Sequence, residues 1–410
     1  MGAGSSLTMK PFTELTDREN AIRLIMKNVK PIKRVEAVPL DETAGRVLAA
    51  DVVAGFDVPP FDRASMDGYA VKARDTSGAN RDTPVRLKII GVQHAGELYD
   101  GELRGGEALE IATGSPMPRG SGAVVMVEDT ALEGDVVVVY KELKAGGNMA
   151  PAGEDMERGD HVLSRGAVLT PGMVGALAAL GYAEAEVYER PRVAVYSSGP
   201  EIVPQGTPLR PGQIYDVNSY TLAAVIESNG GVPVKRGIML DDVESIEAAV
   251  MDAAEHDMGV FSGGSSVGAK DLFGEVMERL GDVFFHGVRV KPGKPTLFGT
   301  VEGTPVFGMP GYPTSCLNNS YVFLAPAVRL MARLPPREAR LLRLAMGHRM
   351  ESRSDREQFI TVRVDEGKAY RVYKQSGDIT SMTHADGYIV LPVGVSVVEE
   401  GEMVDITLLY

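Results

Sequence analysis

Three loops built from small residues offer the first chemistry in this sequence. They read Ser197-Ser198-Gly199-Pro200-Glu201, Gly263-Gly264-Ser265-Ser266-Val267-Gly268 and Pro310-Gly311-Tyr312-Pro313-Thr314-Ser315. Glycine lets backbone N–H groups approach a phosphate closely, and a following helix N-terminus adds favourable partial charge. One such loop could equally be a tight strand-to-helix turn, but three of them favour a phosphate-binding edge.

Acidic side chains accompany these loops. Glu201, Asp241 and Asp271 each stand at or just beyond the end of a predicted strand. Carboxylates beside a bound phosphate suggest Mg²⁺, which takes one or two of them as ligands. Helix capping is the alternative, because Asp241 precedes Glu244 by three residues and Asp271 falls in a first helical turn. Both interpretations stay open on the local sequence.

A dense basic stretch, Arg-Val-Lys-Pro-Gly-Lys-Pro, occupies residues 289–295. The whole chain carries a formal net charge of -14. Lys291 and Lys294, fixed by two prolines and a glycine, are typical of a rigid anion clamp. A solvated turn is the alternative.

The sequence Gly-Ser-Ser-Val-Gly at 264–268 also matches G-x-S-x-G, the nucleophile elbow of α/β-hydrolases. Ser266 would be the nucleophile, with Asp282 and either His348 or His384 as partners. A serine hydrolase is therefore the alternative function. Against it, the other two loops have no role in acyl transfer. The P-loop and dinucleotide-binding signatures are absent, so neither an NTPase nor a dehydrogenase is indicated.

From residue 192, strand and helix patterns alternate, which predicts a parallel, doubly wound sheet. The expected strands are 193–197, 232–238, 258–262 and 283–290, and the expected helices are 218–228, one after 241, 270–280 and 313–331. A hairpin turn is expected at Glu302-Gly303. Ligands of such sheets bind at the carboxyl ends of the strands, where the three loops begin.

The remaining sequence predicts three further parts. An amphipathic helix over 16–29 and a second helix over 171–180, which is expected to pack on it, belong to a discontinuous mixed N-terminal domain. Short β-branched runs between glycine-rich turns predict separate β domains before and after the sheet. The expected domains are 1–58 with 156–190, 59–155, 191–335 and 336–410.

Composition limits the function classes. With 410 residues, 44% hydrophobic and 24% charged, the chain is globular and multidomain. Its negative charge argues against broad binding of nucleic acid or anionic membranes. One cysteine excludes an intramolecular disulfide, and six scattered histidines disfavour a Cys/His metal cage. The absence of a long apolar stretch or signal peptide predicts a cytoplasmic protein.

Taken together, the segments resemble the molybdopterin molybdenumtransferases, the MoeA family that includes the gephyrin E domain. The matching stretches are 59–71, 111–116, 123–128, 153–155, 262–268, 290–295 and 308–315, with 376–377 and 385–387 near the C-terminus. Their order along the chain is far more specific than any one motif.

The resemblance implies an elongated mixed N-terminal domain, an inserted β domain, a molybdopterin-binding α/β domain and a C-terminal β-barrel. It also implies a homodimer with an active site shared between chains. The implied reaction inserts molybdenum from molybdate into adenylated molybdopterin and releases AMP in the presence of Mg²⁺. A separate adenylyltransferase would supply the substrate, and molybdoenzymes or cofactor carriers would receive the product.

The resemblance also implies residue roles. Asp67 and Asp155 would act in metal insertion from across the dimer, and Glu201, Asp241 and Asp271 would line the metal edge. The implied substrate-binding residues are Thr113, Ser198, Glu201, Gly263, Gly264, Ser265, Ser266, Lys291, Lys294, Pro310, Pro313 and Ser315.

Three positions depart from the family pattern. Pro200 replaces a common aspartate, Tyr312 replaces an asparagine, and Gly287 stands where some members have lysine. A paralogue with altered oxyanion preference, such as tungstate, or with weakened activity is therefore an alternative within the family. The resemblance to gephyrin also allows a non-catalytic molybdopterin-binding scaffold.

Overall fold

The structure is a computed structural model that describes residues 14–263, 271–352, 355–372, 374–375 and 377–409. The chain divides into two compact units, of which unit 1 comprises Met1–Glu36 with Tyr188–Tyr410 and unit 2 comprises Ala37–Val187.

Unit 1 is built around a six-stranded sheet. Its order is β16 (Val232–Met239), β13 (Arg192–Ser198), β17 (Met258–Ser262), β21 (Thr304–Met309), β20 (Leu297–Val301) and β18 (Gly281–His286). The first four strands are parallel, as predicted. Strand β20 runs in the opposite direction, because the hairpin at Glu302-Gly303 reverses the chain with φ of 51° and 82°. Strand β18 pairs antiparallel with β20 and therefore runs in the same direction as the first four.

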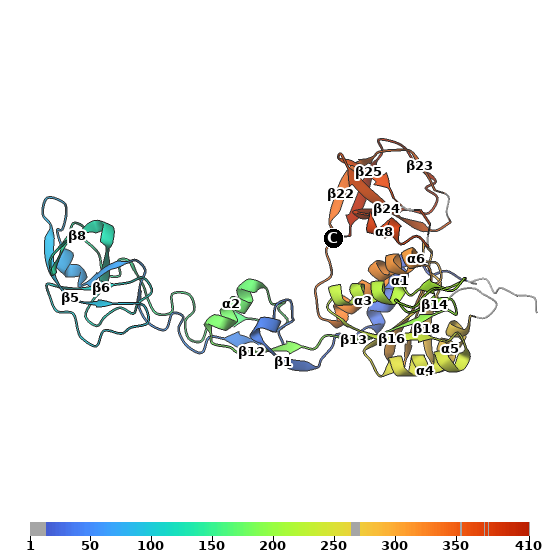
Figure 1. The fold of residues 1–410 in the computed structure, drawn as a ribbon, viewed down its shortest axis with the longest axis horizontal. Helices are drawn as coiled ribbons and strands as arrows, with labels where there is room; N and C mark the ends of the chain where they lie inside the picture. The colour runs from blue at the N-terminus through green and yellow to red at the C-terminus, as the bar shows by residue number, and fades with distance from the viewer. Residues whose placement is uncertain (1–13, 264–270, 353–354, 373, 376, 410) are drawn as a thin grey trace, which may run out of the picture. The chain divides into compact units, whose positions relative to one another are not determined.

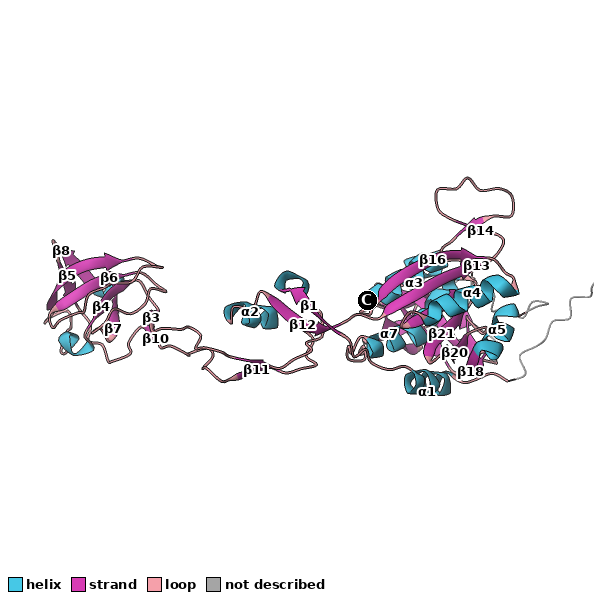
Figure 2. Ribbon diagram, turned by 90° about the horizontal axis from the view of Figure 1, so that it is seen from below, coloured by secondary structure: helices cyan, strands magenta, loops and turns pink. Residues whose placement is uncertain are grey.

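Helices cover both faces of this sheet, which confirms the doubly wound prediction (Figures 1 and 2). On one face lie α1 (Arg18–Asn28), α3 (Asn218–Ser228), α6 (Pro313–Asn319), a π-helical turn (Ser320–Leu324) and α7 (Ala325–Met331). On the other lie α4 (Val243–Ala254) and α5 (Leu272–Leu280). Alternation along β13 explains the two cores, since Val193 and Val195 enter one and Ala194 enters the other.

The first helix packs in a different core from the one that the sequence predicted. Ala21 and Ile25 of α1 are buried in the core of the unit 1 sheet. Helix α2 (Pro171–Ala179) instead contributes Leu177 to a core of unit 2. The buried face of α1 is therefore part of the α/β core, whereas α2 belongs to the core of unit 2.

The C-terminal part of unit 1 is a closed five-stranded barrel, as predicted. Its strands are β24 (Glu357–Asp365), β25 (Lys368–Arg371), β22 (Leu341–Met346), β28 (Met403–Leu408) and β26 (Gly387–Leu391), which pairs back with β24. Strand β19 (Val290–Lys291) leaves the α/β core and adds to β24 in parallel. The barrel also has β23 (Met350–Glu351), β27 (Val397–Val398) and α8 (Thr380–Thr383).

Unit 2 contains a second six-stranded sheet and several short pairs. The sheet order is β7 (Ala123–Met126), β4 (Gly68–Val71), β6 (Glu107–Ile111), β5 (Val85–Gln93), β9 (Val136–Val139) and β8 (Thr130–Glu133). The short strands are β1 (Val35–Pro39) with β12 (Glu184–Tyr188), β2 (Val52–Val53) with β11 (His161–Leu163), and β3 (Arg63–Ala64) with β10 (Met149–Ala150).

Candidate functional site

Four parallel strands of unit 1 end side by side. Register pairs Ser198 with Met239, Ser197 with Ser262, and Ser262 with Met309. The three small-residue loops therefore leave one edge of the sheet, as their positions in the sequence predict. Two of these loops touch, because a Cβ on Gly311 would lie 3.6 Å from the Gly263 Cα.

Gly263 shows why this edge needs glycine. Its φ is +89°, and a Cβ there would lie 2.3 Å from the Ser198 carbonyl oxygen. The close approach holds the ends of β13 and β17 together. Gly264, Ser265 and Ser266, the other predicted phosphate-binding residues of this loop, lie outside the described residues.

A buried acid organises the first loop. Asp216 Oδ1 accepts hydrogen bonds from Ser197 Oγ at 2.9 Å and from the Ser219 N–H at 3.1 Å. Asp216 therefore ties the end of β13 to the start of α3. The sequence interpretation missed it, although an acid just before a predicted helix was the available signal.

The three predicted metal-edge acids lie in different surroundings. Asp241 Oδ1 lies 3.4 Å from Ser198 Oγ, and the N-cap of α4 is the next residue, Asp242, which accepts from the Ser245 N–H at 2.8 Å. Glu201 is exposed, with its carboxylate close to Gly199. The capping interpretation of Asp241 is wrong, because Asp242 is the residue that caps α4.

Asp271 does cap a helix. One carboxylate oxygen accepts from the Gly274 N–H at 3.1 Å at the start of α5, and the other lies 3.1 Å from His286 Nε2. Burial raises the pKa of Asp271, while the charge of His286 acts in the opposite direction.

The basic loop is held from below by an asparagine of α6. Asn319 Nδ2 donates to the Gly293 carbonyl and to Thr296 Oγ1, both at 2.7 Å. Gly293 has φ +107°, and a Cβ there would lie 2.3 Å from Asn319 Nδ2. Lys291 and Lys294 are half-buried on this fixed loop. Prolines alone do not explain its shape, and the sequence interpretation missed Asn319.

The loop at 310–315 connects the sheet to helix α6 and to the barrel. Pro310 is buried, Pro313 is in the first turn of α6, and Ser315 is buried. Thr314 Oγ1 donates to the Asp378 carbonyl at 2.8 Å. Tyr312, by contrast, is 66% exposed, so its ring is available at the edge and does not fill a core.

Asp67, Thr113 and Asp155 belong to unit 2, unlike the other candidates. Asp67 lies in the turn between β3 and β4 and accepts from the Thr113 N–H at 2.7 Å and from Thr113 Oγ1 at 2.8 Å. These bonds, the backbone one first, lower the pKa of Asp67. Asp155 is exposed, and its N–H donates to the Val58 carbonyl at 3.0 Å.

Three family models match the chain in order. The MoeA N-terminal region (domain I and II) matches 16–181, the probable molybdopterin binding domain matches 194–330, and the MoeA C-terminal region (domain IV) matches 343–409. Molybdopterin molybdenumtransferase 2 of Mycobacterium tuberculosis is 40% identical over 327 residues, which are 78% of this chain and 80% of that relative. This chain is a member of the MoeA family.

Other relatives agree with this MoeA assignment. Molybdopterin molybdenumtransferase of Bacillus subtilis is 32% identical, covering 91% of this chain and 90% of that protein. The crystal structure of a molybdopterin biosynthesis MoeA protein from Pyrococcus horikosii has a TM-score of 0.83 and 39% identity over 96% of this chain and 99% of that one. The predicted family and fold class are confirmed.

The serine hydrolase alternative finds no support in a MoeA protein. Its elbow at 264–268 lies outside the described residues. One proposed partner, His348, lies in the barrel segment, with its ring centroid 6.0 Å from that of Tyr370. In the described part of the chain, no helix is both long and apolar enough to cross a bilayer.

Proposed function

We propose that this chain is a molybdopterin molybdenumtransferase, which inserts molybdenum from molybdate into the dithiolene of adenylated molybdopterin and releases AMP. Family membership supports the class. The observation that carries the proposal is the edge of the sheet. There, loops of small residues leave the carboxyl ends of adjacent parallel strands and approach one another.

The substrates explain the residue types at this edge. Molybdate is a dianion and the adenylated pterin carries a diphosphate, so their mutual repulsion must be offset before they approach. In the proposal, Gly263 to Ser266, Ser198 and Ser315 donate to phosphate. Lys291 and Lys294 hold molybdate or phosphate, and Pro310 and Pro313 shape the floor.

Mg²⁺ would be bound by few protein ligands. Within the described residues, no three His, Cys, Asp or Glu side chains come together as a metal cluster. In the proposal, one or two of the carboxylates of Glu201, Asp241 and Asp271 bind the ion and substrate phosphate completes its coordination. When bound there, Mg²⁺ would neutralise phosphate charge.

The proposed protein is a cytoplasmic homodimer, in which Asp67 and Asp155 reach the edge of the partner chain. Thr113 orients the Asp67 carboxylate through its two hydrogen bonds. The adenylated substrate would come from a separate adenylyltransferase, and molybdoenzymes or carriers would take the product.

Release of AMP tests the proposal directly. The purified chain is incubated with adenylated molybdopterin and Mg²⁺, with and without micromolar molybdate or tungstate. We expect oxyanion-dependent AMP release, and the more effective oxyanion identifies the preferred metal. Tight pterin binding without AMP release would contradict the transferase and indicate the scaffold alternative.

Tyr312 provides a second variable in the same assay. Its exposed ring replaces the amide that is usual in the family, so Tyr312→Asn should shift the ratio of molybdate-dependent to tungstate-dependent rates if the ring contacts the oxyanion pocket.

A further inference from the structure

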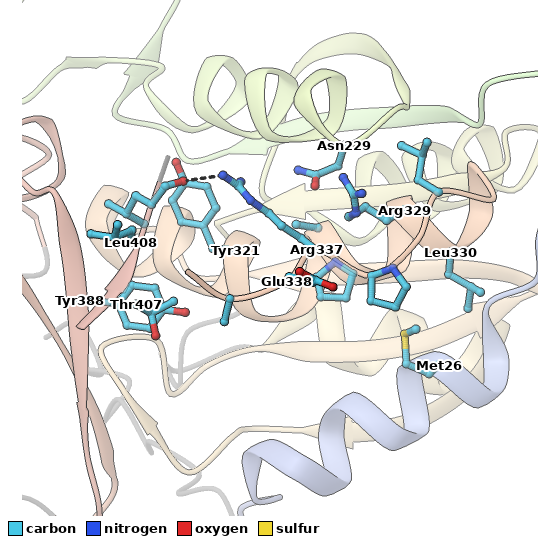
Figure 3. A pocket seen from close by; sticks show the side chains of 16 residues that line it. Met26, Asn229, Tyr321, Arg329, Leu330, Arg337, Glu338, Tyr388, Thr407 and Leu408 are labelled. Atoms are coloured by element: carbon cyan, nitrogen blue, oxygen red, sulfur yellow. Dashed lines mark hydrogen bonds between the residues drawn. The ribbon is translucent and has the colours of Figure 1, made fainter. Parts of the chain in front are cut away.

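A cavity of about 260 Å³ lies within unit 1, away from the edge described above (Figure 3). Helix α7, the segment that follows it and barrel strand β28 form most of its lining. Its apolar walls include Met26 of α1, Leu330 and Leu334. These residues give it room for a small organic molecule with an apolar body.

Two arginines give the cavity its charge. Arg329 Nε donates to the Pro335 carbonyl at 2.8 Å, and Arg337 Nη2 donates to the Leu409 carbonyl at 3.0 Å. Neither guanidinium forms an ion pair with a carboxylate in the described part of the chain, although Glu338 also lines the cavity. Both arginines are thus held in place by neutral carbonyl groups.

The two cations also act on each other. Burial, and then the charge of Arg337, lower the pKa of Arg329. An anion between the two would relieve this repulsion, and the planar guanidinium matches a carboxylate with two parallel hydrogen bonds.

Helix geometry separates the cavity from the sheet edge. Helix α3 begins at Asn218, whose Nδ2 bonds the Gly311 carbonyl at that edge, and Asn229 just beyond its end lines the cavity. Eleven helical residues at about 1.5 Å each place the two ends roughly 16 Å apart. The cavity is therefore a separate hollow at the other end of α3 from the sheet edge.

We propose that this cavity binds a small carboxylate with an aromatic or branched aliphatic body, whose anionic end contacts Arg329 and Arg337. The apolar walls favour such a ligand over a phosphate ester, because a more strongly hydrated dianion gains little from apolar contact. The proposal is independent of the transferase activity.

Calorimetric titration of the full chain with 3-phenylpropionate tests the charge requirement. We expect saturable binding that weakens about tenfold or more in Arg337→Gln and Arg329→Gln, the loss of one charge-assisted contact. Arg343→Gln, on the exposed surface of β22, should bind like the unchanged chain. The uncharged analogue 3-phenylpropanol should bind more weakly.

The position of the ligand is checked by methyl NMR of labelled methionines. Met26 should shift on titration and Met309, at the end of β21, should not. No binding at millimolar concentration would overturn the proposal. So would an affinity in both arginine variants equal to that of the unchanged chain, or shifts at Met309 without shifts at Met26.

Discussion

Gly263 carries a tight steric requirement at the sheet edge. Alanine there would place its Cβ 2.3 Å from the Ser198 carbonyl oxygen at a φ of +89°. We expect Gly263→Ala to lower the free energy of unfolding by about 1–3 kcal/mol and to impair AMP release. Denaturant unfolding and the AMP assay measure both effects.

Gly311→Ala is the matched control, because its Cβ would meet only the Gly263 Cα at 3.6 Å, an ordinary contact. It should stay within about 0.5 kcal/mol of the unchanged chain. If both variants lost the same free energy of unfolding, the close approach of Gly263 to the Ser198 carbonyl would not be the cause of the loss.

Thr113 sets the ionisation of Asp67. Removing the hydroxyl in Thr113→Val leaves the backbone donor, so the pKa of Asp67 should move upward, part of the way to its ordinary value. Because the folded-state pKa is lowered, ionised Asp67 favours the fold above the ordinary pKa. That contribution is lost as pH falls through the folded-state pKa.

Carbon-13 NMR titration of aspartate carboxyl groups measures the shift. Thr83→Val serves as the control, because the Thr83 hydroxyl donates to the Gly78 carbonyl and not to Asp67. It should leave the pKa of Asp67 unchanged. An unmoved Asp67 titration in Thr113→Val would refute the assigned cause.

Sequence patterns find residues by type and by their place after a strand, which is how the glycines and lysines of the edge were predicted. Asp216 and Asn319 were missed because their partners lie far off in sequence. Asp216 meets Ser197 from 19 residues away, and Asn319 meets Gly293 from 26 away. Only tertiary packing brings such pairs together.

At the scale of elements, Asp271 at the start of α5 has two assigned roles, helix capping and Mg²⁺ binding, which substitutions can distinguish. Asparagine caps a helix about as well as aspartate, whereas alanine costs about 1 kcal/mol. We expect Asp271→Ala to reduce stability and Asp271→Asn to keep it. If Asp271 is a Mg²⁺ ligand, Asp271→Asn should still raise the Mg²⁺ concentration needed for AMP release.

Thermal unfolding and a Mg²⁺ titration of the rate distinguish the roles. Unchanged Mg²⁺ dependence in Asp271→Asn would leave capping as the role of Asp271. Asp242→Asn is the control, because Asp242 caps α4 by accepting from the Ser245 N–H. It should change neither the thermal stability nor the Mg²⁺ concentration needed for AMP release.

Element positions were predicted well from periodicity, and strand β17 at Met258–Ser262 has the predicted limits. Strand direction also followed the prediction. The sequence indicated a parallel sheet with a hairpin at Glu302-Gly303, and β20 alone among the six described strands of this sheet runs against the others, since a two-residue turn cannot support a parallel crossover. The partner of α1 was wrong because an amphipathic stripe identifies a buried face without identifying what covers it.

For the whole molecule, the proposed shared active site predicts complementation between chains. Asp67→Asn and Lys291→Gln should each be inactive, and dissociating and reassociating their mixture should restore about a quarter of normal AMP release. Half of the dimers are then mixed, and each has one intact site.

A mixture of Asp67→Asn with Asp155→Asn is the control. Both changes lie in unit 2, so no mixed dimer regains an intact site. Recovery equal to that control, or none, would place Asp67 and Lys291 in the same chain's site or outside the reaction.

The α/β class followed from the alternation of strand and helix patterns, and the β domains from their short strands. The barrel was implied by the resemblance to the family. The boundaries at 59–155 and 336–410 stay predictions. Closure of the barrel through pairing of β24 with β26 joins residues far apart in sequence, which periodicity alone does not encode.

The chain leaves and re-enters unit 1 at neighbouring points. The Glu189 N–H bonds the Arg34 carbonyl at 3.0 Å on one side, and the Leu40 N–H bonds the Ala183 carbonyl at 3.0 Å on the other. Adjacent ends are what a domain insertion requires. An ancestral protein could thus have run from α1 directly into β13, and a single genetic insertion of the intervening segment would have left its hydrophobic core intact.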